Sequence, residues 1–197
     1  MSVRDAHSMS NQPISRFDVP PLDDLPDDIR EQIVAVQEKT GFVPNVFLAL
    51  ARRPDEFRAF FAFHAALMDS DVGLSKAERE LIVVATSARN RCLYCVVAHG
   101  AILRIRTKDP LIADQVAVNP AKADLDERKR AIVTFALRVA EDSASITDAD
   151  LDDMRELGFS NDEIWDIGAI TSLFALSNRY ANFAGITPNA EFYAMAR

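Results

Sequence analysis

The pattern of apolar and polar residues along the chain predicts helices throughout. Segment 55–68, for example, places five large apolar side chains on one broad face, as a helix packed on a core does. They are Phe57, Phe60, Phe61, Phe63 and Leu67. No stretch alternates apolar and polar residues next to a hairpin dipeptide, so we expect no strands. The sequence therefore predicts an all-α fold with a single helical domain over residues 20–197, preceded by a polar, flexible arm at 1–19.

Caps and helix breakers indicate where the expected helices begin and end. Three segments open with a short polar residue and a Glu three positions later, the capping-box pattern. They start at Ser75, Asp124 and Ser160 and predict helices over about 76–89, 125–141 and 161–184. Prolines, a threonine cap and glycine stops predict the remaining helices. These cover about 27–40, 45–52, 55–68 and 148–157.

Two of these segments resemble each other. Ser75–Glu80 and Asp124–Lys129 share a capping residue, a Glu-Arg pair at the same spacing and an apolar helix that follows. The likeness is compatible with an internal duplication and, equally, with two independent capping boxes. Because the second segment has no Cys-x-x-Cys, a duplicated scaffold would carry one active half.

Composition and charge exclude several classes of protein. Apolar residues make up 49% of the chain and charged residues 26%, as in ordinary globular domains. With 22 basic and 30 acidic residues the net charge is −8, which argues against nucleic acid or an anionic membrane as a partner. The longest uncharged runs, 92–103 and 167–178, are shorter than the roughly 18–20 residues of a membrane span. Because residues 1–13 are polar and lack an apolar signal region, we expect a cytoplasmic protein.

The chain contains two cysteines, Cys92 and Cys95, in one Cys-x-x-Cys motif. A bond between them closes too short a loop to hold a fold together, so a structural disulfide is not expected. In a reducing compartment such a pair is typical of redox chemistry or metal binding. On a helix, His99 falls within about 60° of both cysteines, so the imidazole can influence a thiol that faces its partner.

Glu80 can join this group only if the chain reverses near Asn90-Arg91. On one straight helix Glu80 would lie about 28 Å from His99. With a reversal, the two residues lie at nearly the same level of an antiparallel helical hairpin. The reversal would also place Cys92 in the first turn of a new helix, where backbone N–H groups favour a thiolate.

These four side chains suffice for thiol peroxidase chemistry. A base or a positive dipole lowers a thiol pKa from about 8.5, and the thiolate reduces a peroxide to leave a sulfenic acid. A second thiol then condenses with the sulfenic acid to a disulfide. The same groups suit a redox sensor or disulfide exchange with a partner dithiol. A zinc site is the third alternative, although structural zinc usually draws its ligands from two Cys/His pairs.

The spacing Glu-x11-Cys-x2-Cys-x3-His, from Glu80 to His99, resembles the signature of the AhpD-like alkylhydroperoxidases in the carboxymuconolactone decarboxylase superfamily. Further segments are similar to the peroxidase-related branch of that family: Gly41–Phe47, Arg58–Met68 and Asn178-Arg179. The superfamily's decarboxylases lack the cysteine pair, so decarboxylation fits this chain poorly.

The resemblance implies an AhpD-like all-α bundle that forms a homo-oligomer (dimer, trimer or hexamer) and reduces hydrogen peroxide or small organic hydroperoxides. It implies Cys92 and Cys95 as the redox pair, His99 as the base and Glu80 as the relay carboxylate. It further implies a dithiol reductant, such as a lipoylated adaptor protein, and neither a cofactor nor a metal. Cys95, beside His99, is favoured as the activated thiol, but Cys92 has the stronger helix-terminus argument, so the order of attack stays open.

Three other residues are expected to serve packing. His64, among phenylalanines, is interpreted as a core or interface histidine. Tyr94 is expected to pack beside the motif, and Trp165 to lie in the core or at a subunit interface.

Overall fold

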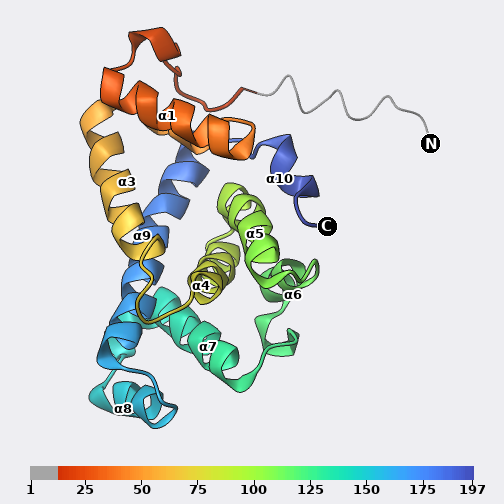
Figure 1. The fold of residues 1–197 in the computed structure, drawn as a ribbon. Helices are drawn as coiled ribbons and strands as arrows, with labels where there is room; N and C mark the ends of the chain where they lie inside the picture. The colour runs from red at the N-terminus through yellow and green to blue at the C-terminus, as the bar shows by residue number, and fades with distance from the viewer. Residues whose placement is uncertain (1–12) are drawn as a thin grey trace, which may run out of the picture.

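The computed structural model describes residues 13–197, and throughout this range the ordered elements are helices (Figure 1). The α-helices are α1 (Asp27–Thr40), α2 (Asn45–Leu50), α3 (Pro54–Met68), α4 (Lys76–Arg89), α5 (Leu93–Thr107), α6 (Ile112–Val118), α7 (Glu127–Asp142), α8 (Asp148–Glu156), α9 (Asn161–Ala184) and α10 (Ala190–Ala194). Three short 3-10 helices lie at Leu22–Asp24, Pro120–Lys122 and Ser143–Ser145. The all-α prediction is confirmed.

The central element is α4, which packs against α5, α6, α7 and α9. Its N-terminus carries the predicted capping box, in which Ser75 Oγ accepts from the Glu78 N–H and Glu78 Oε2 accepts from the Ser75 N–H. The consecutive residues Leu81–Val84 are all buried. A helix that is apolar on every side must be surrounded by other elements, and this explains why α4 lies in the middle of the bundle.

The longest helix, α9, extends beside α3 and α4, and α1 lies across the end of this arrangement where α9 finishes and α3 begins (Figure 1). The predicted capping box at Ser160 forms, and Gly185 ends α9 in the left-handed conformation with φ 62°. Aromatic packing joins α2 to α3, since the Phe47 and Phe61 rings stack with centroids 4.1 Å apart. Thus α1, α2 and α3 form a unit that covers one end of the α4–α5 hairpin.

The start of α7 differs from the prediction. Asp126 caps the helix by accepting the Lys129 N–H, so the predicted capping box of Asp124 and Glu127 is wrong. Leu125 is buried, which keeps the chain extended up to Asp126 instead of letting a helix begin at 125. The likeness between the segments at Ser75 and Asp124 therefore lacks a shared cap, and the duplication stays a prediction.

Other boundaries and elements were predicted only in part. The helix expected over 45–52 ends at Leu50, while α6, α10 and the 3-10 helices were not predicted. Of the expected arm, residues 1–12 lie outside the described part of the chain. Arg16 N–H donates to Ala184 O, and Thr187 N–H donates to Ile14 O, so residues 14–16 lie against the end of α9.

A fully buried arginine fixes the loop that leads into α4. The Arg79 guanidinium donates to the carbonyl oxygens of Leu67, Val72 and Leu74 over 2.7–3.1 Å. It also pairs with the Asp166 carboxylate of α9 at 2.9 Å. A buried charge needs this complete set of partners, and the set holds α3, α4 and α9 in one register.

Several large apolar side chains remain exposed on α3 and α9. Trp165 is 76% exposed in the single chain, so of its two expected places the core is wrong, and the subunit interface stays a prediction. Phe63, Leu176 and Phe183 are about half exposed. The homo-oligomer stays a prediction, to be tested by light scattering, and this is the face on which we expect a second copy. No helix in residues 13–197 is both long and apolar enough to cross a membrane.

Candidate active site

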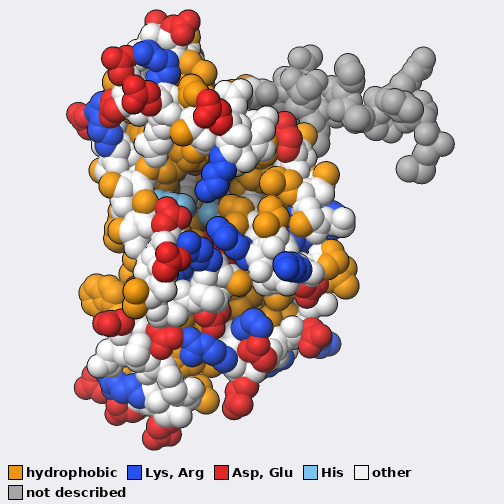
Figure 2. All heavy atoms as spheres, in the orientation of Figure 1, with side chains coloured by type: hydrophobic (Ala, Val, Ile, Leu, Met, Phe, Trp, Pro, Cys, Tyr) orange, Lys and Arg blue, Asp and Glu red, His pale blue; other side chains and the backbone are white. Residues whose placement is uncertain are grey.

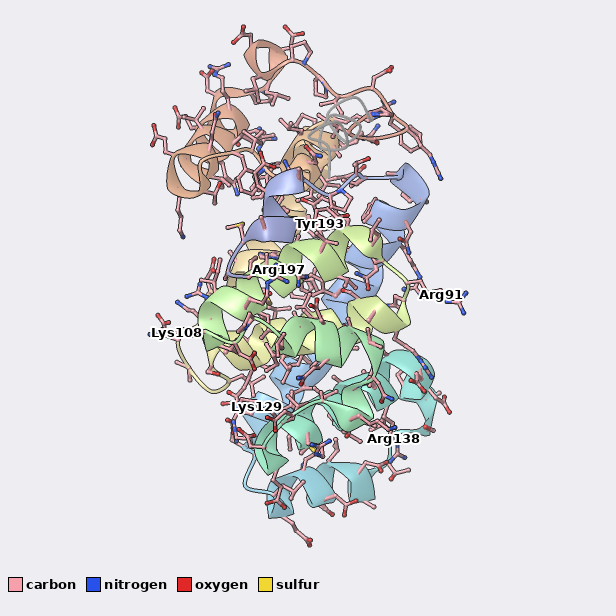
Figure 3. All side chains as sticks on the ribbon, turned by 90° about the vertical axis from the view of Figure 1, so that its right-hand side faces the viewer. Arg91, Lys108, Lys129, Arg138, Tyr193 and Arg197 are labelled. Carbon is pink, nitrogen blue, oxygen red and sulfur yellow. The ribbon has the colours of Figure 1, made fainter. Side chains whose placement is uncertain are left out.

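The predicted chain reversal separates α4 from α5. Arg91 adopts the left-handed conformation with φ 53°, directly after Asn90 ends α4. Its side chain points away from the protein at one end of α5, while Lys108 marks the other end (Figure 3). Cys92 is the N-cap residue of α5. The reversal at Asn90-Arg91 and the place of Cys92 at a helix start are therefore confirmed.

The reversal brings Glu80 and His99 into direct contact. Glu80 Oε2 lies 2.7 Å from His99 Nδ1, and both side chains are nearly buried. With the carboxylate as acceptor, Nδ1 carries the hydrogen and Nε2 is left free to act as a base. The predicted antiparallel pairing of these residues is confirmed at hydrogen-bond distance.

Both cysteines are free thiols inside the protein. Cys92 is 0% exposed and Cys95 is 2% exposed. Cys95 Sγ lies 3.9 Å from Ser177 Oγ of α9. The fully buried Asn178 side chain follows on the same helix, and its Nδ2 donates to Ser87 Oγ at 2.9 Å. The side chains of α9 thus complete the surroundings of the two sulfur atoms.

The two thiols differ in acidity because they share a hydrogen bond. The Cys95 thiol donates toward Cys92, and this lowers the pKa of Cys92 to about 7 despite its burial. The backbone N–H of Cys95 and the Asn178 side chain act in the same direction. The same hydrogen bond and burial raise the pKa of Cys95. In the resting pair the proton therefore belongs to Cys95, which needs a base to become a nucleophile.

The lowered pKa of Cys92 predicts that its thiol is partly ionised at neutral pH, and a titration can detect this ionisation. The ultraviolet absorbance of the thiolate should rise with a midpoint near pH 7, and Cys92→Ser should abolish this step. Cys95→Ala removes the main donor to the Cys92 sulfur, so it should move the midpoint upward. A wild-type midpoint near that of free cysteine, about 8.5, would contradict the assignment.

A cavity of about 290 Å³ opens beside Cys95 and His99, whereas Cys92 does not reach it. Figure 2 shows a hollow below α1 in which histidine side chains, in pale blue, lie among apolar ones. Besides Cys95 and His99, its lining residues are Gln32, Val36, Pro44, Val46, Phe47, Phe60, Phe61, His64, Ala65, Asp69, Tyr94, Ala98, Ile102, Phe174, Ser177 and Phe192. A small organic molecule can therefore reach Cys95 and the imidazole together.

The cavity contains one residue whose place the sequence did not reveal. His64 projects from α3, and its ring centroid lies 6.3 Å from that of His99. Only the tertiary fold brings the two histidines together, and the spacing of 35 residues along the chain carries no signal for it. Tyr94 packs beside the motif as predicted, and its hydroxyl accepts the Val46 N–H, which ties α5 to α2.

Other features of the described chain are less suited to the chemistry. A larger crevice of about 640 Å³ beside α7, α8 and α9 has no cysteine or histidine in its wall. In residues 13–197, no three His, Cys, Asp or Glu side chains are arranged to hold a metal ion. The zinc alternative for Cys92, Cys95, His99 and Glu80 therefore has no support in the geometry.

Comparisons with known proteins agree with this arrangement. The model of the carboxymuconolactone decarboxylase family matches residues 54–118, the segment that contains Glu80, both cysteines and His99. No curated protein matches the chain significantly.

Solved structures resemble the chain over nearly its whole length. An uncharacterized peroxidase-related protein with an alkylhydroperoxidase AhpD core, from Ralstonia eutropha JMP134, is 63% identical with a TM-score of 0.93, and the alignment covers 94% of this chain and 98% of that one. A peroxidase-related protein from Silicibacter sp. TM1040 is 39% identical with a TM-score of 0.90, covering 94% and 97%. The debrominase Bmp8 is 19% identical with a TM-score of 0.75, covering 95% and 97%, and shares the fold alone. The chain belongs to the carboxymuconolactone decarboxylase family and has the AhpD-like fold of its peroxidase-related members.

Proposed function

We propose that the protein is a dithiol-dependent peroxidase that reduces hydrogen peroxide or small organic hydroperoxides through Cys92 and Cys95. One observation carries the proposal. Cys95 lies in the wall of a cavity next to His99, an imidazole already paired with the Glu80 carboxylate at 2.7 Å. The family of peroxidase-related relatives supports the same class of reaction.

The first step is removal of the proton from Cys95. Because burial and its hydrogen bond to Cys92 raise the pKa of Cys95, the thiol needs a base, and Nε2 of His99 is free for this role. The resulting imidazolium faces Glu80, whose carboxylate stabilises the positive charge. Glu80 therefore acts through His99 and is a positioning residue.

The second step transfers oxygen. The Cys95 thiolate attacks the terminal oxygen of the hydroperoxide, an S–O bond forms and the O–O bond breaks. The departing oxygen leaves with the electron pair of that bond and takes the proton from His99. The products are a sulfenic acid on Cys95 and one molecule of alcohol, or of water when the substrate is hydrogen peroxide.

The third step regenerates the enzyme. The Cys92 thiolate attacks the Cys95 sulfur, the S–S bond forms, the S–O bond breaks, and the departing hydroxide takes a proton from solvent to become water. An external dithiol then reduces the Cys92–Cys95 disulfide by exchange and is itself oxidised to a disulfide. A lipoylated adaptor protein is one dithiol of this kind. Because both sulfurs are buried, a slender dithiol that can enter the cavity fits better than a broad protein surface.

Peroxide consumption with dihydrolipoamide as reductant tests the proposal. The wild-type protein should turn over many equivalents of hydroperoxide per chain, and the Cys92→Ser/Cys95→Ser double variant should match the rate without enzyme. Undiminished turnover in the double variant would refute the proposal. One disulfide formed per chain without further turnover would instead identify a redox sensor.

A further inference from the structure

The cavity contains a second imidazole that the reaction described above does not use. His64 lies in the last two turns of α3, opposite the α5 helix that carries Cys95 and His99. Its ring is surrounded by aromatic rings, with centroids 6.1 Å from Phe174 and 6.3 Å from Phe61. The two histidines thus face the same space from different helices.

The nitrogens of His64 are open to this space. Among residues 13–197 no side chain or backbone group forms a hydrogen bond with its ring. In the same part of the chain, no side-chain nitrogen or oxygen is both sealed from solvent and without a partner. The His64 nitrogens are therefore accessible from the cavity, where they can meet a ligand.

The surroundings also determine the charge of His64. Burial, followed by the nearby His99, lowers the pKa of His64 to about 4, and Glu80 and Asp69 only partly offset this. The ring is therefore neutral at pH 7, with one N–H donor and one acceptor. A hydroperoxide likewise has one O–H donor and two oxygens that accept, so its polar end matches a neutral imidazole.

We propose that His64 is a substrate-contacting residue that binds the hydroperoxide O–O group by a hydrogen bond and holds it against Cys95. This inference rests on the proposed function. The His64 N–H donates to the oxygen that departs when the O–O bond breaks, and so stabilises its developing negative charge. The proton that finally neutralises this oxygen still comes from His99, so the proton balance of the reaction is unchanged.

The rate at which a hydroperoxide oxidises the reduced protein in a single round tests the role of His64. His64→Phe retains an aromatic ring in an aromatic environment but has no nitrogen, and should lower the second-order rate constant for cumene hydroperoxide about 10- to 100-fold. His64→Gln retains a donor and an acceptor and should recover part of the loss. The thiolate titration midpoint should stay at its wild-type value in both variants, because His64 contacts the peroxide and not the sulfur.

Phe63→Leu is the matched control, since Phe63 is the neighbouring residue on α3 and lines the crevice outside this cavity. It should leave the rate constant unchanged. A rate within twofold of wild type in His64→Phe would overturn the role of His64. If His64→Phe fails to fold, His64→Leu takes its place. A rate constant for His64→Leu equal to that of wild type would then overturn the role of His64. A His64→Gln variant that reacts no faster than His64→Leu would do the same. Wild-type thiols that react no faster than free cysteine would instead refute the proposed function itself, so the two failures are distinguishable.

Discussion

The Cys95→Ser variant is expected to consume hydroperoxide no faster than buffer, a loss of at least about 1,000-fold. Cys95 is the sulfur in the cavity wall, and Cys92 lies behind it with no exposed surface. Cys92 has the lower pKa of the two cysteines, but its thiolate does not line the cavity and so does not meet the peroxide. We therefore expect Cys95 to react first with the peroxide, and a serine hydroxyl cannot replace its thiolate.

The Cys92→Ser variant should behave differently and provides the control. It retains the attacking sulfur, so it should consume one equivalent of hydroperoxide and then stop, with a sulfenic acid on Cys95 that no second thiol resolves. Dimedone labelling followed by peptide mass spectrometry would locate the adduct. An adduct on Cys92 in the Cys95→Ser variant, formed at the wild-type rate, would reverse the assigned order.

The second large effect is expected at the pair formed by Glu80 and His99. Replacing His99 with Gln removes the base and should lower kcat/KM for hydroperoxide about 100- to 10,000-fold. Glu80→Gln leaves the base in place but removes the charge that stabilises the imidazolium, so a loss of about 100-fold is expected. We expect a loss of activity of this size because Glu80 and His99 are nearly buried, and a carboxylate stabilises a neighbouring cation more strongly where there is little water.

The pH dependence separates this role from a structural one. The pKa of Cys95 is raised, so wild-type Cys95 needs the base at pH 7, whereas at high pH the thiolate forms without it. The difference between Glu80→Gln and wild type should therefore narrow as the pH rises. Glu78→Gln removes the same charge from the same helix but faces Arg128, and should leave the pH profile unchanged. A uniform loss at all pH values in Glu80→Gln would speak for misfolding.

Local sequence signals predicted much of this fold. The bounds of α4 and α9 follow from the capping boxes at Ser75 and Ser160 and, for α9, from the stop at Gly185, all of which act within one turn of the helix. The Glu80–His99 contact follows from helix arithmetic once a reversal at Asn90-Arg91 is assumed. In each case the physical cause lies among residues that are close in the sequence.

The remaining features depend on contacts between distant segments. Burial of Leu125 moves the start of α7 to Asp126, and this depends on the packing of α6 and α7. His64 enters the cavity only because α3 lies beside α9, and Asn178 reaches the sulfurs from the opposite end of the chain. No pattern of residues within a single helix predicts such contacts between segments that are distant in the sequence.

The position of Cys92 connects redox state with the stability of a helix. Cys92 is the N-cap of α5 and Cys95 is three residues later, the two positions that a Ser-x-x-Glu capping box occupies on α4 and α9. In the reduced protein, the negative charge of the Cys92 thiolate lies at the positive end of the α5 dipole, although its side chain forms no capping hydrogen bond. In the oxidised state of the proposed cycle, a covalent bond would join the same two positions. If the pair cycles as proposed, the first turn of α5 is held by charge in one state and by a bond in the other.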